Sequence, residues 1–74
     1  MSREAADAIV KVMIRHLDEH GELLRTIQGL CTAEEFVEFR IAIGQCSGAI
    51  VFEVLNPIVT RYPDLHPGDS DDTP

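Results

Sequence analysis

The segment from Thr32 to Tyr62 constrains the fold of this chain more than any other feature. It reads as a helix, and its centre from Ile41 to Phe52 carries no charged residue. A helix that packs against one neighbour needs a single apolar stripe. This segment offers two, so we expect one of them to be buried against something outside the chain.

The first half of the chain predicts an amphipathic helix over residues 3–28. Ser2 is placed to cap it, and apolar residues recur at the three- and four-residue spacing of one helical face, at Ala6, Ile9, Met13, Leu17, Leu24 and Ile27. Gly29 is a natural C-terminal stop.

A second helix is predicted over residues 33–56. Thr32 and Glu35 have the spacing of a capping box, and the connection after Gly29 is short enough to make the two helices antiparallel. Pro57 interrupts the pattern, which predicts that Asn56 caps a short third helix over residues 57–61. The expected fold is therefore an all-α helical hairpin domain over residues 1–62.

The two apolar stripes of the second helix differ in their content. One contains Phe36, Phe39, Ile43, Cys46, Ile50 and Val54, and we assign it to packing on the first helix. The other is the predicted interface, and it contains Val37, Ile41, Gly44, Gly48, Val51 and Leu55. Two hairpins related by a two-fold axis would bury both stripes in a four-helix bundle, so a homodimer is expected.

Residues 63–74 form an acidic segment for which we expect disorder. Their four aspartates account for −4 of the formal charge of −7. Tyr62 and Leu65 lie where this segment begins, and two interpretations stay open: they dock onto a partner, or they fold back over the open end of the hairpin.

Charge and composition exclude several classes of function. Nucleic-acid binding requires clustered basic residues, which this chain lacks. The apolar run from Ile41 to Val59 contains Glu53, whose burial in lipid is costly, so a membrane span is not expected. Together with an N-terminus that lacks a signal-peptide core, these observations predict a cytoplasmic protein.

The two cysteines are expected to be reduced. Cys31 falls in the turn and Cys46 well inside the second helix, so they lie about 20 Å apart, too far for a disulfide. Cys46 is expected to be a small core residue, and Cys31 the more reactive thiol.

The sharpest chemical motif is the string His16-Leu-Asp-Glu-His20, which resembles the inverted zinc-peptidase motif H-x-x-E-H. Two histidines four apart on a helix can share a metal, and Glu19 could serve as a base. That family needs a further distant carboxylate ligand and a substrate cleft, for which this chain has little room. We therefore predict no enzyme and no cofactor, and interpret His16 and His20 as packed in or beside the core or the dimer seam. Buried there near their symmetry mates, they would loosen a dimer as the pH falls.

One further resemblance rests on Pro57, Ile58, Tyr62, Pro63, Asp64, Leu65 and Pro67. This ending, after a charged helix and a glycine-containing apolar helix, is similar to small helical accessory proteins encoded by phages and prophages. The resemblance implies a protein that binds and modulates a host protein in the host cytoplasm. The alternatives are a structural subunit of a larger assembly such as a virion and, third, a metal-binding protein that uses the two histidines.

Overall fold

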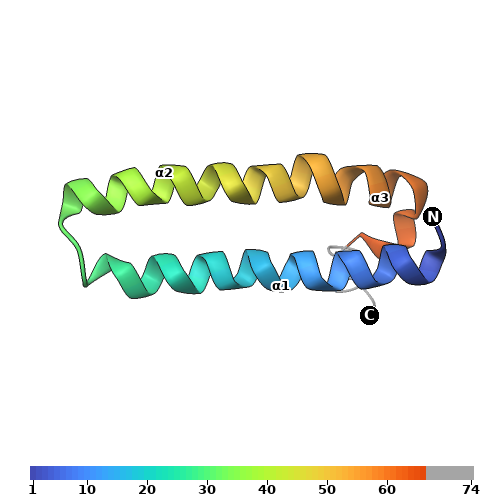
Figure 1. Ribbon diagram of the computed structural model, residues 1–74, viewed down its shortest axis with the longest axis horizontal. Helices are drawn as coiled ribbons and strands as arrows, with labels where there is room; N and C mark the ends of the chain where they lie inside the picture. Colours follow the sequence, from blue (N-terminus) through green and yellow to red (C-terminus); the bar gives the residue numbers. More distant parts are fainter. Residues whose placement is uncertain (67–74) are drawn as a thin grey trace, which may run out of the picture.

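The chain is an all-α hairpin. The computed structural model describes residues 1–66, and residues 67–74 lie outside the described residues. α1 runs over Arg3–Gln28, α2 over Ala33–Ala49 and α3 over Asn56–Arg61. α2 and α3 return alongside α1 (Figure 1). The predicted all-helical hairpin is confirmed, and residues 1–66 contain no strand.

α1 begins after Ser2 and ends before Gly29, as expected. The Ser2 side chain accepts a hydrogen bond from the Ala5 N–H at 3.1 Å. At the other end the Gly29 N–H donates to the Ile27 carbonyl. Gly29 has φ −89° and ψ −3°, so it ends the helix without the left-handed conformation that often places glycine there.

A capping box starts α2 after a short turn. The Glu35 N–H donates to Thr32 Oγ1 at 3.1 Å, and the Thr32 N–H donates to Glu35 Oε1 at 2.8 Å. These two bonds satisfy backbone donors that would otherwise face water at the helix start. The turn thus directs α2 back along α1.

The region before Pro57 differs from the prediction of a helix that continues to residue 56. α2 ends at Ala49, and the segment η1, Ile50–Leu55, is a π-helix that leads directly into α3. Pro57 has no N–H, and its ring would clash with the carbonyl four residues earlier in a regular α-helix. The α-helix instead widens into a π-helix, in which the Asn56 N–H donates to the Val51 carbonyl five residues back. α3 begins at Asn56 itself, with Leu55 in the cap position, so the expectation that Asn56 caps the third helix is wrong.

The core lies at the end of the hairpin that carries the chain's N-terminus. Its buried residues are Ala6 and Val10 from α1, Leu55 from η1 and Ile58 from α3. α2 contributes no buried residue. The half of the hairpin next to the turn therefore lacks a closed core.

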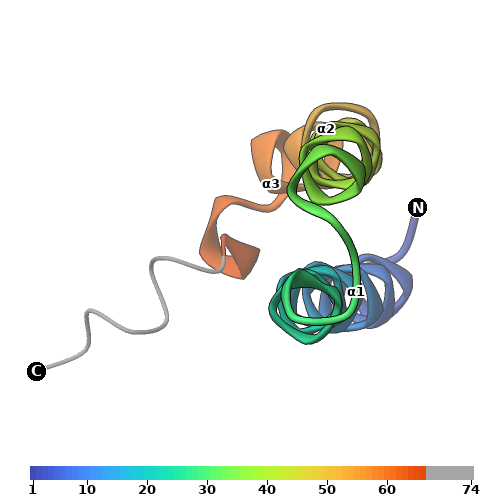
Figure 2. The same ribbon diagram turned by 90° about the vertical axis from the view of Figure 1, so that its left-hand side faces the viewer.

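The predicted boundary at residue 62 is placed too early. Residues Pro63–Leu65 form a 3₁₀ turn, η2, on one broad side of the hairpin (Figure 2). The Tyr62 hydroxyl donates to the Met1 carbonyl at 2.6 Å, Asp64 pairs with Arg3, and Leu65 packs against the core. Of the two interpretations of Tyr62 and Leu65, the structure shows the fold-back.

Candidate functional site: an apolar groove at the turn

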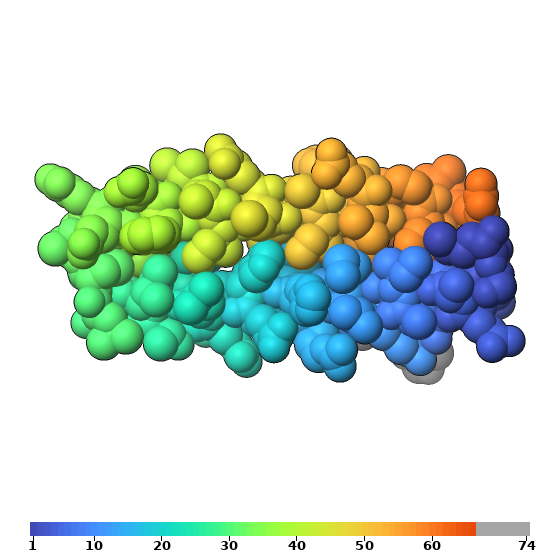
Figure 3. Space-filling model, viewed as in Figure 1, coloured from blue at the N-terminus to red at the C-terminus, as the bar shows by residue number. Residues whose placement is uncertain are grey.

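Large apolar side chains remain exposed along the hairpin. They are Met1, Leu23, Leu30, Val37, Phe39, Ile41 and Phe52. Figure 3 shows the broad side opposite η2, along which α1 and α2 lie side by side with no third element over them. Protein domains normally bury such surfaces between two layers, and this hairpin supplies one layer.

A mainly apolar hollow lies at the turn, and we call it the turn groove. It has a volume of about 320 Å³ and is lined by Leu23, Ile27, Leu30, Cys31, Phe39 and Ile43. α1 supplies the first two, α2 the last two, and the turn supplies Leu30 and Cys31. Leu23 is 46% exposed, Phe39 52% and Leu30 78%, so the groove opens to solvent.

The turn groove and η2 lie on opposite broad sides of the hairpin. Leu17 packs against the core, and at 100° per residue Ile27 lies about 80° to one side of it and Ile14 about 60° to the other. Ile27 lines the turn groove, whereas Ile14 lines a second pocket that includes His66, next to η2. We refer to the two broad sides as the groove side and the η2 side.

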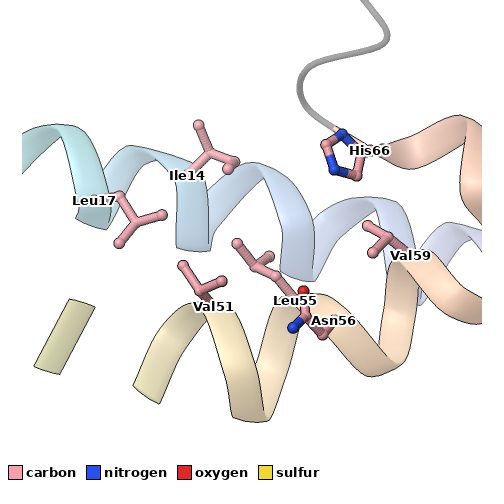
Figure 4. Close-up of a pocket in the computed structure, with 7 residues that line it drawn as sticks. All are labelled: Ile14, Leu17, Val51, Leu55, Asn56, Val59 and His66. Atoms are coloured by element: carbon pink, nitrogen blue, oxygen red, sulfur yellow. The ribbon is translucent and has the colours of Figure 1, made fainter. Parts of the chain in front are cut away.

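The pocket on the η2 side accounts for part of the predicted interface. Figure 4 shows Val51 and Leu55 pointing toward α1, with His66 at the edge of the pocket. The pocket has a volume of about 200 Å³, and Leu55 is buried. These two residues pack within the chain itself, so they are not available on an outer face.

The remaining members of the predicted interface are open. Val37 and Ile41 are exposed, and a Cβ atom placed on Gly44 or Gly48 would meet nothing within 4 Å. The structure therefore divides the predicted stripe into an exposed part on α2 and a part that covers α1. It also leaves Phe39, which we expected to pack on α1, at the edge of the turn groove.

The structure places the two histidines in different surroundings. His16 is exposed and not packed in the core, so its expected place in a dimer seam stays a prediction. His20 is half-buried, and its Nδ1 atom lies 2.7 Å from Ser47 Oγ on α2. Within residues 1–66 no three side chains of the metal-binding types converge to hold an ion, so His16 and His20 have no third protein ligand there.

Both cysteines are free thiols. Cys31 is half-buried beside the turn groove, and its thiol donates to the Ile27 carbonyl at 3.0 Å. Cys46 is exposed, so its assignment to the core is wrong. It lies on the same side of α2 as Phe39, which is also exposed, so the helical wheel groups the two correctly but does not show that this side is uncovered.

One segment satisfies the length and composition of a membrane-spanning helix. It extends over Ala33–Arg61, and only 11% of its most apolar stretch of 18 residues is buried inside the chain. Core helices of soluble proteins also pass this test, but they are mostly buried. The low burial again shows that this half of the hairpin lacks cover.

No family model, no curated protein and no solved structure matches the chain. The resemblance to small phage proteins therefore stays a prediction, and function has to be argued from the surface itself.

Proposed function

We propose that this protein is a self-associating helical module that binds another protein, and that its basic unit is a dimer of hairpins forming a four-helix bundle. The observation that carries the proposal is the absence of any buried residue in α2. A chain of 74 residues with so small a core is expected to gain much of its stability from association. A second layer of helices supplies the missing cover.

The charge distribution supports a protein as the further partner. Residues 1–62 carry a formal charge of only −3, and the remaining −4 lies beyond them. Nucleic acids and anionic lipid surfaces attract basic patches, and this chain has six basic residues against thirteen acidic ones. The free thiols Cys31 and Cys46 fit a reducing compartment, which supports our proposal of a cytoplasmic location.

A structural subunit is the second candidate. Apolar residues are exposed on both sides of α2, with Phe39 toward the groove side and Val37 and Ile41 away from it. If both surfaces make contacts between copies, the contacts continue beyond a dimer, as in the shell of a larger assembly.

Sedimentation equilibrium of the full chain at neutral pH tests the proposal. We expect a mass twice that of the 8.2 kDa chain over a wide range of concentrations. A mass that keeps rising with concentration would favour the structural subunit. A folded monomer at all concentrations would refute self-association, and flotation with neutral phosphatidylcholine vesicles would then ask whether lipid covers Ala33–Arg61 instead.

A further inference from the structure

We infer that the groove side is the surface through which two copies associate, and that the stripe containing Gly44 and Gly48 is not. The inference rests on the proposed self-association and names its contact surface. The occupant of the turn groove is then a second copy of this chain.

The groove side is mainly apolar on both helices. From α1 it presents Ile9, Val12, Leu23 and Ile27 at matching helical positions, with the exposed His16 among them, and from α2 it presents Phe39, Ile43 and Cys46. The η2 side is more charged, and on α2 it includes the exposed Arg40 beside Val37 and Gly44. There α1 presents Asp7, Lys11, Asp18 and Arg25, and η2 covers part of the surface.

In a contact between two copies, every charged side chain on the surface of one copy is also present on the surface of the other. In a two-fold contact each residue meets the same surface of the partner, so a charged stripe would face like charges or require an ordered set of ion pairs. The centre of the groove side contains no Asp, Glu, Lys or Arg, although the exposed His16 lies within it, and Glu19, Glu35 and Glu53 lie at its edges. An uncharged centre with a polar rim is the usual anatomy of a stable interface.

The exposed apolar area on this side is a substantial part of what a stable interface buries. At about 200 Å² for a fully exposed large side chain, Leu23, Leu30 and Phe39 still offer roughly 350 Å². Each partner of a standard interface buries about 800 Å². The turn groove supplies almost half of this. The stripe continues toward the termini through Val12 and Ile9, which are half-buried and add a smaller area.

Two adjacent positions on α2 provide a matched test. Phe39 is 52% exposed and Ile41 55%, and they lie about 160° apart around the helix axis. We would compare Phe39→Glu with Ile41→Glu in the full chain by sedimentation equilibrium, with circular dichroism to verify helix content. Phe39→Glu is expected to raise the dimer dissociation constant at least about 100-fold, because it places a carboxylate from each copy in the contact. Ile41→Glu is expected to change it less than about threefold.

Leu23→Glu on α1 is a second, independent test. It changes a different residue that lines the turn groove, so it would not share a folding defect specific to Phe39→Glu. It should dissociate the dimer while the helix content persists. A dimer that survives both Phe39→Glu and Leu23→Glu, or that dissociates with Ile41→Glu alone, overturns the assignment of the surface but leaves self-association intact. A wild-type chain that is monomeric refutes the proposed function itself.

Discussion

His20 Nδ1 and Ser47 Oγ lie 2.7 Å apart and join the middle of α1 to α2 by a side-chain hydrogen bond. The two residues are 27 positions apart in the chain, and both are half-buried. The bond forms only when the two helices keep their present alignment along the hairpin. A polar pair in an otherwise apolar contact therefore favours one alignment over slipped ones.

Ser47→Ala should destabilise the fold by about 1 kcal/mol, because it leaves the His20 ring nitrogen without its partner. Urea unfolding measures the effect. Ala is also a better helix former than Ser, so a double-mutant cycle with His20→Ala isolates the interaction. His16→Ala, one turn earlier on an exposed position, is the control and should show no coupling to Ser47. Coupling energies that are equal for the two histidines would contradict the role of the bond.

Leu55→Ala and Phe52→Ala should have opposite outcomes although both lie in η1. Leu55 is buried in the core, and its truncation should cost about 2–5 kcal/mol, a large part of the stability of a domain this small. Phe52 is 71% exposed, and its truncation should cost less than about 0.5 kcal/mol. Thermal unfolding followed by circular dichroism, in the Phe39→Glu background to remove contributions from association, compares them. A larger loss for Phe52→Ala would place the core elsewhere.

Thr32→Ala should lower the free energy of unfolding by about 1 kcal/mol, because it removes the acceptor for the Glu35 N–H at the start of α2. Thr26→Ala is the matched control. The Thr26 hydroxyl donates to the Glu22 carbonyl within α1, where that carbonyl can also accept the regular helix bond. Guanidinium titrations should show Thr26→Ala to be neutral or slightly stabilising. Equal losses for the two variants would argue against the capping box.

Gly44→Ala tests whether the stripe that contains Gly44 is free of contacts between copies, as the groove-side contact requires. A Cβ atom on Gly44 would meet nothing within 4 Å, and Ala exceeds Gly in helix propensity by up to about 1 kcal/mol. If copies associate through the groove side, Gly44→Ala stabilises the chain and leaves the dimer dissociation constant unchanged. Weaker association on analytical ultracentrifugation would show that another helix packs closely against Gly44.

The sequence predicts the ends of α1 and the start of α2 because the determinants are local. Ser2, Thr32 and Glu35 make capping bonds to backbone groups three residues away, and such contacts follow from spacing alone. The response to Pro57 was not predictable in the same way. A proline can end, kink or widen a helix, and packing of Leu55 and Ile58 on α1 favours the form that keeps the helix continuous.

The faces of α2 could be predicted only in part. A helical wheel groups Phe39 with Phe36, and it groups Leu55 with Ile41, but it does not fix which group points at α1. The π-helix then changes the direction in which residues after Ala49 point, so Leu55 packs inward although Ile41 does not. Helical periodicity does not predict the turn groove, because Leu30 lies outside both helices. The available signal was the presence of this apolar residue in the turn, between Gly29 and Cys31.

Through the π-helix, Pro57 affects the direction in which side chains in the C-terminal third of the hairpin point around the helix axis. A π-turn closes each hydrogen bond over one more residue than an α-turn, so each residue advances the chain by a smaller angle around the axis. Restoring an N–H at position 57 would let the regular four-residue bonding pattern continue through η1. Ile58 and Tyr62 would then rotate away from Ala6 and Met1 together, although neither side chain had been altered. The missing backbone donor and the packing of Leu55 and Ile58 on α1 thus together set which residues of the second arm face the first.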